Sequence, residues 1–268
     1  MASRRRHYGL SVGLNRTGIE TMRSLIAALA LAVALPAAAE EKPLARGDVE
    51  TIVREYLLAN PEILFEVQEA YEAKQKRERD EAAKLALAER RDQVFSSPHQ
   101  TEIGNPDADV TVVEFFDYNC SYCARALDDM DALLAADPNL KFVLKEVPII
   151  RPESVGAHRV SLAVFKLAPG KYADFHRRLF AVPGVKTDRA ALEVAEALGL
   201  ERDAVMQAAN DDTITDAFRE ATQLAEALGI TGTPSYVVGD ELIFGALGAD
   251  VLREKIAAVR ECGKTSCT

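Results

Sequence analysis

Residues 115–123 read Phe-Phe-Asp-Tyr-Asn-Cys-Ser-Tyr-Cys and join an apolar run to a pair of cysteines. The β-branched and aromatic run 110–116 predicts a buried strand, and the residues after it predict a helix to about Ala136. Cys120 would then lie at the start of a helix, where unpaired amides and the positive end of the helix dipole favour a thiolate. Cys123 would follow almost one turn later, within reach of the same sulfur.

A cysteine pair in this setting is typical of thiol–disulfide exchange. A Cys120 thiolate attacks a disulfide of another molecule, and Cys123 then resolves the mixed disulfide. Two other interpretations are a static disulfide and half of a zinc site, but zinc needs two further ligands at a spacing that this sequence lacks. The strand–helix context favours redox chemistry, for which we expect no metal and no cofactor.

The bulk composition limits the remaining possibilities. The chain has 268 residues, of which 48% are hydrophobic, so it can bury one ordinary core with some accessory structure. A net charge of -10 and an isoelectric point near 5.1 argue against nucleic acid or an anionic membrane as a partner. The four cysteines form two close pairs, Cys120/Cys123 and Cys262/Cys267, rather than a dense disulfide scaffold.

The N-terminus has the pattern of a secretory signal peptide. A basic start at Met22-Arg23 leads into the apolar run 25–35, and small residues follow up to Ala39. We therefore predict that residues 1–39 are a signal peptide, with Met22 as an alternative start. A membrane anchor is the competing interpretation, but the run is too short for a hydrocarbon core of roughly 30 Å. Export to the periplasm would give disulfide chemistry its substrates.

Residues 40–95 predict two helices with an apolar face and then a charged linker helix. Asp48 is the expected N-cap of the first helix, and Asn60-Pro61 is expected to start the second. From 74 to 81 the sequence is polar all round, with opposite charges four residues apart, which predicts a solvated helix. Short helices are marginal in water, so their apolar face needs a partner, most simply a second copy of the chain. The face consists of Ile52, Val53, Tyr56, Leu57, Leu64, Val67 and Tyr71.

The region from about Ser96 predicts a small α/β domain with a helical insertion. A second strand is expected over 141–150, and residues 154–229 show mainly helical patterns. A hairpin turning at Gly239-Asp240 and a helix over 250–259 complete the domain. Residues 262–268 form a tail.

Three separated features resemble the DsbA-like branch of the thioredoxin-fold family, and the resemblance covers residues 96–261. Cys120-Ser121-Tyr122-Cys123 matches the active-site motif in position and context. Glu114 stands six residues earlier, where the family carries a buried acid beneath the cysteines. Thr233-Pro234 matches the cis-proline loop that faces the active-site sulfur. The resemblance therefore implies a thioredoxin fold with a helical insertion and five site residues: Cys120, Cys123, Glu114, Thr233 and Pro234.

The two supporting features also have ordinary interpretations. Glu114 could be an exposed strand carboxylate; if it is buried, its raised pKa would let it exchange a proton with Cys123. Pro234 could be a routine strand-entry proline, because only about 5–6% of X–Pro bonds are cis. In the family, a cis bond leaves the backbone of Thr233 free to pair with an extended substrate.

The other cysteines and the histidines carry weaker signals. Cys262 and Cys267 predict a structural disulfide, with an accessory redox pair or a metal-binding pair as the alternatives. His158 and His176 fall in the helical block, where they are expected to be satisfied or solvent-facing rather than catalytic.

Residues 53–62 are similar to the amino-terminal region of the suppressor-of-copper-sensitivity C (ScsC) proteins. That resemblance implies a homo-oligomer, with a trimer favoured, in which several active sites hold one client. Thr233 and Tyr122 also look more like those of isomerases and reductases, and the absence of histidine between the cysteines favours a moderate oxidant. We expect a disulfide isomerase that acts on exported proteins and is recycled by a membrane redox partner. The alternatives are a monomeric DsbA-like oxidase and a thiolate copper-binding protein.

Overall fold

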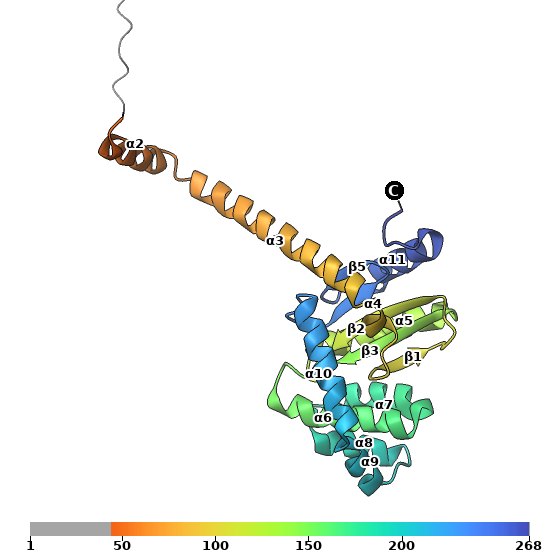
Figure 1. The fold of residues 1–268 in the computed structure, drawn as a ribbon. Helices are drawn as coiled ribbons and strands as arrows, with labels where there is room; N and C mark the ends of the chain where they lie inside the picture. The colour runs from red at the N-terminus through yellow and green to blue at the C-terminus, as the bar shows by residue number, and fades with distance from the viewer. Residues whose placement is uncertain (1–43, 268) are drawn as a thin grey trace, which may run out of the picture. The chain divides into compact units, whose positions relative to one another are not determined.

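The computed structural model describes residues 44–267 (Figure 1). The predicted signal peptide lies outside these residues. The chain divides into two compact units, with the boundary between Phe65 and Glu66, and each is described by itself. Within residues 44–267, no helix combines the length and apolar character needed to cross a membrane.

The N-terminal unit contains helix α2 (Arg46–Ala59) and the first residues of helix α3 (Ile63–Glu89). The prediction that Asp48 is the N-cap is wrong: α2 begins two residues earlier, and the Asp48 carboxylate accepts the amide of Ala45 at 3.0 Å. Asn60 ends α2 instead of starting the next helix, because its amide and its side chain both donate to the carbonyl of Tyr56. None of the α2 residues is buried.

Helix α3 is polar along most of its length and carries ion pairs between side chains four residues apart. Lys76 and Asp80, for example, are joined at 2.7 Å. The expected single element up to Ser96 is interrupted at Arg90, and a short helix α4 (Arg91–Phe95) follows. Leu87 and Val94 are buried in the core of the second unit, so the end of α3 and all of α4 are parts of that unit's fold.

The second unit is built on a five-stranded sheet of order β1-β3-β2-β4-β5. Strands β2 and β3 are parallel, and the other neighbours are antiparallel. Strand β3 ends at Glu146 rather than at Ile150 as expected, since Pro148 has no amide to donate to a ladder. The edge strand β1 was not predicted. The strands are β1 (Thr101–Gly104), β2 (Val110–Phe116), β3 (Leu140–Glu146), β4 (Ser235–Val238) and β5 (Glu241–Phe244).

Helices cover both faces of this sheet. Helix α5 (Ser121–Ala136) and helix α11 (Ala249–Cys262) pack on one face, and α4 and α10 (Asp212–Ala227) pack on the other. Because side chains alternate along a strand, Val112, Glu114 and Phe116 of β2 share one face. That face is the one covered by α5, the helix that carries the cysteine pair.

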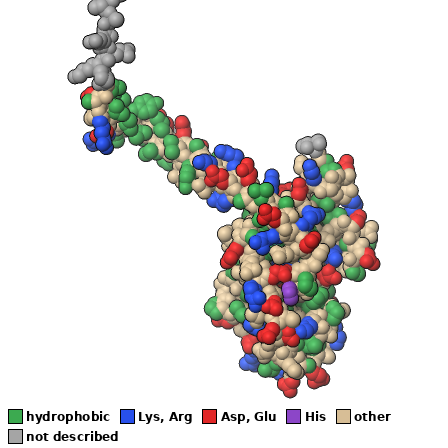
Figure 2. Space-filling view, in the orientation of Figure 1, with side chains coloured by type: hydrophobic (Ala, Val, Ile, Leu, Met, Phe, Trp, Pro, Cys, Tyr) green, Lys and Arg blue, Asp and Glu red, His purple; other side chains and the backbone are tan. Residues whose placement is uncertain are grey.

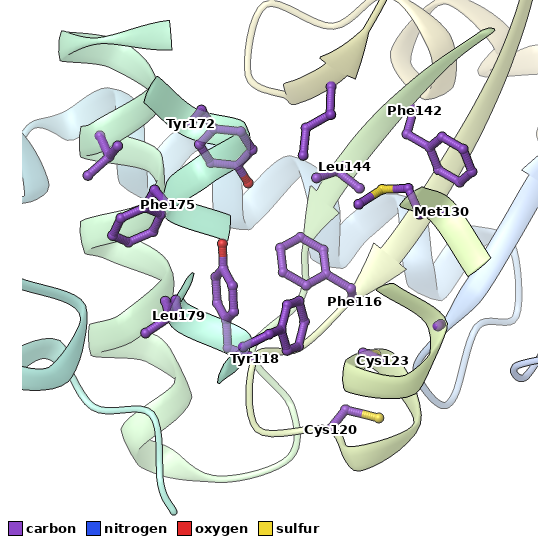
Figure 3. Packing of buried hydrophobic residues seen from close by; sticks show 14 of the residues in the cluster. Phe116, Tyr118, Cys120, Cys123, Met130, Phe142, Leu144, Tyr172, Phe175 and Leu179 are labelled. Atoms are coloured by element: carbon purple, nitrogen blue, oxygen red, sulfur yellow. The ribbon is translucent and has the colours of Figure 1, made fainter. Parts of the chain in front are cut away.

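The predicted helical insertion is confirmed and lies between β3 and β4. It consists of α6 (Pro152–Leu167), α7 (Pro169–Ala181), α8 (Asp188–Ala197), α9 (Arg202–Ala209) and α10. Proline occupies the first helical turn of both α6 and α7, where its missing amide costs no hydrogen bond. Phe175 and Leu179 of α7 face the cluster around Phe116 and Tyr118 in Figure 3, so the insertion packs directly behind the cysteine loop.

Candidate active site

The cysteine pair lies where the sequence placed it, at the N-terminus of α5 (Figure 3). Cys120 is the N-cap residue with extended backbone angles, and Cys123 lies in the first turn. Both are free thiols, with 5% of Cys120 and 1% of Cys123 exposed. Cys120 is therefore the member of the pair that a large substrate reaches more easily.

The Thr233-Pro234 peptide bond is cis, as the resemblance implied. The loop lies beside Cys120, since Cys120 Sγ is 3.1 Å from the carbonyl oxygen of Thr233 and donates to it as a thiol. The Thr233 hydroxyl is buried without a hydrogen-bond partner among the described residues. The fold thus brings Cys120 and Thr233 into contact, although they are 113 positions apart in the chain.

Glu114 is buried, so the interpretation as an exposed strand carboxylate is wrong. Only 4% of the residue is exposed, and it pairs with the buried Tyr236 of β4. Burial raises the pKa of Glu114 to about 8, and the charges of Cys120 and Asp129 act in the same direction. The carboxyl group is therefore mostly protonated at neutral pH.

The two thiols differ strongly in acidity. The hydrogen bond from the Cys123 side chain lowers the pKa of Cys120 to about 5, with help from Thr233 and from the backbone amides of Cys123 and Tyr122, while burial opposes the shift. Burial raises the pKa of Cys123 far above its usual range, and its hydrogen bond to Cys120 and the charge of Glu114 add to the effect. Cys120 is thus an anion and Cys123 a proton donor at neutral pH, which are the states of a nucleophile and a resolving thiol.

Two buried acids beside this site, Asp117 and Glu146, were missed by the sequence analysis, and His158 was named there without a role at the site. Asp117 accepts hydrogen bonds from the amides of Asn119 and Ile150 at 2.7 and 2.8 Å. Glu146 and His158 form a second buried pair behind the loop. A signal for Glu146 was present in the sequence, because it is an acid at the end of an apolar strand, as Glu114 is within β2.

The histidines of the insertion are both buried and hydrogen-bonded, so the solvent-facing alternative is wrong. The second cysteine pair forms the expected disulfide, with Cys262 and Cys267 joined at 2.07 Å. This pair ends α11, whereas the first pair begins α5.

Family models match both parts of the chain. The DSBA-like thioredoxin domain matches residues 111–257, which is more than half of the chain. The N-terminal domain of copper resistance protein ScsC matches residues 46–78. The chain belongs to the DsbA-like thioredoxin family, and its N-terminal region has the ScsC pattern that the sequence analysis identified.

Solved structures agree with this assignment. A thioredoxin-like oxidoreductase from Silicibacter pomeroyi is 37% identical, with a TM-score of 0.61, and the match covers 64% of this chain and 98% of that one. ScsC from Proteus mirabilis in a compact conformation is 27% identical with a TM-score of 0.62, and the match covers 81% of this chain and 99% of that one. The second match is longer because it extends over the helices that precede the thioredoxin domain.

Curated relatives match over shorter parts of their length. The thiol:disulfide interchange protein DsbA from Bordetella pertussis is 32% identical over 143 residues, which are 48% of this chain and 63% of that protein. The chain also spans 26% of the length of the Na⁺/H⁺ antiporter NhaA 1 from Mycobacterium, with 28% identity over 162 residues. Family membership therefore rests on the thioredoxin domain.

Proposed function

We propose that this chain is an exported disulfide isomerase and reductase that acts in the periplasm on exported proteins through Cys120 and Cys123. The observation that carries the proposal is the combination of an acidic helix-start thiol with an N-terminal segment of ScsC type. An acidic thiol facing the cis-proline loop supports exchange chemistry. The N-terminal segment supports the isomerase over the oxidase.

In the isomerase reaction the Cys120 thiolate attacks a client disulfide, forms a mixed disulfide and expels a client thiolate. The expelled thiolate attacks another disulfide within the client, and a client thiolate finally displaces Cys120. No electrons are transferred overall. If Cys123 attacks the mixed disulfide first, the client leaves reduced and the enzyme becomes a disulfide, which a membrane redox partner must reduce again.

Glu114, Thr233 and Pro234 assist this chemistry. Cys123 must lose its proton before it can attack, and Glu114 is the buried acid beneath the pair that can take that proton when ionised. The backbone carbonyl of Thr233 lies beside Cys120, and we propose that an extended client segment pairs with the backbone of this loop as an added strand.

The N-terminal segment, residues 40–95, is proposed as the assembly module of a homo-oligomer, with a trimer favoured by the resemblance to ScsC. Its large apolar side chains are exposed: Ile52, Val53, Tyr56, Leu64, Val67 and Tyr71 each have more than half of their surface open to solvent. Figure 2 shows hydrophobic side chains on the helices α2 and α3. Exposed large apolar side chains of this kind favour an interaction site, and identical segments around a symmetry axis would bury them.

The proposal is tested by refolding a client with scrambled disulfides while the mass of the enzyme is measured by light scattering. The mature protein should restore client activity and have the mass of an oligomer. A doubly charged variant, Ile52→Asp with Tyr56→Asp, should be monomeric and lose isomerase activity but still reduce a small disulfide. Leu85→Asp is the matched control, because Leu85 is also exposed but lies on the linker helix, beyond the apolar face that ends at Tyr71. A monomeric mature protein that oxidises reduced clients would instead indicate the DsbA-like oxidase.

A further inference from the structure

A buried carboxylate is connected to the backbone just before the nucleophile through one imidazole ring. Glu146, at the end of β3, and His158, on α6, are 3% and 0% exposed. Nδ1 of His158 bonds to Oε2 of Glu146, and Nε2 accepts the amide of Tyr118 at 3.1 Å. Tyr118 stands two residues before Cys120, so the helical insertion holds the active-site loop by its main chain.

The same carboxylate also holds the side chain of Tyr118. Oε1 of Glu146 accepts the hydroxyl of Ser161 at 2.7 Å, and the Ser161 oxygen lies 2.9 Å from the hydroxyl of Tyr118. In Figure 3 the Tyr118 ring points away from the cysteines towards α7 and Tyr172. Tyr172 bonds to Glu146 at 3.2 Å and accepts Thr101 Oγ1 at 2.9 Å.

The protonation of the ring follows from its neighbours. Burial lowers the pKa of His158 and opposes a charge on the ring, whereas the neighbouring carboxylates of Glu146 and Asp117 act in the other direction. A ring protonated on both nitrogens would, however, direct Nε2–H at the Tyr118 amide, which is itself a donor. The amide contact therefore fits the neutral ring with its proton on Nδ1, where Glu146 accepts it.

The loop held in this way determines which groups reach the sulfur. The amide of Cys120 donates to the carbonyl of Asp117 at 3.0 Å, closing the turn that leads into α5. The Asp117 carboxylate is fixed by Ser154 Oγ at 2.8 Å and by two amides. The amides of Tyr122 and Cys123 stabilise the thiolate of Cys120 only if the turn presents the sulfur to them.

We propose that Glu146 and His158 are positioning residues for the nucleophile: through the amide of Tyr118 they fix the Asp117–Cys120 turn, so that the first amides of α5 reach the sulfur. This inference rests on the proposed exchange function of Cys120. It assigns a residue of the helical insertion, His158, to the chemistry of the site through the main chain of the active-site loop.

The test is the pH titration of Cys120 by thiolate absorbance in the full mature chain. His158→Leu removes the acceptor for the Tyr118 amide and should raise the pKa of Cys120 by about one unit, a tenfold change in the thiolate equilibrium. His158→Gln, whose side-chain oxygen can replace Nε2 as acceptor, should restore most of the acidity. Thr101→Val is the matched control, because it removes a buried hydrogen bond of the same cluster without touching Tyr118; it should leave the titration unchanged.

The Glu146→Gln variant distinguishes a positioning role of Glu146 from a direct effect of its negative charge on the pKa of Cys120. Removal of a nearby negative charge would by itself favour the thiolate and lower the pKa of Cys120. Glutamine has a single acceptor oxygen, so it cannot accept from the ring and also from the hydroxyls of Ser161 and Tyr172 as the carboxylate does. The ring is then held less firmly, which predicts a rise instead, smaller than that of His158→Leu. This variant keeps the shape of the side chain, so it tests the positioning role even if the His158→Leu protein does not fold.

The inference is overturned if folded Glu146→Gln lowers or preserves the pKa of Cys120, or if Thr101→Val raises it equally. Failure of the proposed function would look different. In that case Cys120 of the unmodified protein would titrate as an ordinary thiol, near a pKa of about 8.5, before any substitution is made.

Discussion

The two cysteine pairs of this chain lie at opposite ends of two helices, and they differ in every property that governs thiol reactivity. Cys120 and Cys123 begin α5 and are free and buried. Cys262 and Cys267 lie at the end of α11, are exposed and form a disulfide. Helix N-termini stabilise anions and helix C-termini destabilise them. The helix end at which a cysteine pair stands is therefore a physical reason for the difference between these two pairs.

The immediate neighbours of the sulfurs reinforce this difference. Cys120 is beside amides and the thiol of Cys123, all of which stabilise an anion. The sulfurs of Cys262 and Cys267 lie 3.5 Å from the carbonyl oxygens of Lys264 and Ala258, respectively. Cys120 also has a carbonyl oxygen nearby, that of Thr233, so the difference comes from the helix end: the C-terminus of α11 does not stabilise a thiolate, and the tail pair is a structural disulfide.

The largest expected effect comes from removing the first sulfur. Cys120→Ser should abolish disulfide exchange, whereas Cys123→Ser should still attack clients and accumulate mixed disulfides, because only the resolving thiol is missing. Non-reducing electrophoresis with a disulfide-containing client measures both. The Cys262→Ser/Cys267→Ser double variant is the control and should retain full exchange. If Cys120→Ser, and not Cys123→Ser, traps clients, the roles of the two thiols are reversed.

Glu114→Gln should stabilise the reduced protein more as the pH rises. Between the ordinary pKa of 4.5 and about 8, folded Glu114 holds a proton that the unfolded chain has lost. The folded protein therefore loses stability with rising pH in this window, on the order of 1 kcal/mol per pH unit, and a glutamine avoids the loss. Urea unfolding at pH 5 and pH 8 measures the difference between the two proteins.

Exposed Glu153→Gln is the control for this experiment and should track the unmodified protein at both pH values. The same Glu114→Gln enzyme should resolve mixed disulfides more slowly, because Cys123 loses its proton acceptor. If the stability difference between the two proteins does not change with pH, the proposed role of Glu114 in proton transfer is contradicted.

The smallest expected effect comes from removing the disulfide between Cys262 and Cys267. The disulfide closes a short loop, and Thr265 within it donates to Asp240 at 3.1 Å, so the tail is attached to the β4–β5 turn. The Cys262→Ser/Cys267→Ser variant should lose about 2 kcal/mol or less of unfolding free energy, the value for a short closed loop. Thermal unfolding measures this loss. A change in the titration of Cys120 in the same variant would contradict the separation of the two pairs.

The parts of the fold that were predictable carry strong local signals. The strand 110–116 is uniformly apolar apart from Thr111 and Glu114. A Cys-x-x-Cys motif follows it directly, and the usual setting of that motif is the junction of a strand and a helix. The turn at Gly239-Asp240 and the helical periodicity of the insertion are equally local. The cis bond at Pro234 came only from family resemblance, since nothing in its neighbours distinguishes it from a trans bond.

The parts that were not predictable depend on distant contacts. Strand β1 has four residues and is stabilised by pairing with β3, almost forty positions later. Glu146 and His158 carry no motif, and their connection to Tyr118 exists only once the insertion has packed behind the sheet. Buried polar groups must find partners, but the sequence alone does not say which ones.

The most direct test of the comparison is the titration of Cys120 in the reduced Cys262→Ser/Cys267→Ser protein, where the tail thiols are absent. Thiolate absorbance should rise with a midpoint at pH about 5, and Cys120→Ser should eliminate that step. Alkylation of Cys120 should follow the same profile, while Cys123 remains protonated across the neutral range. A midpoint near the ordinary thiol value of about 8.5 would contradict the claim that the start of α5 makes Cys120 the nucleophile.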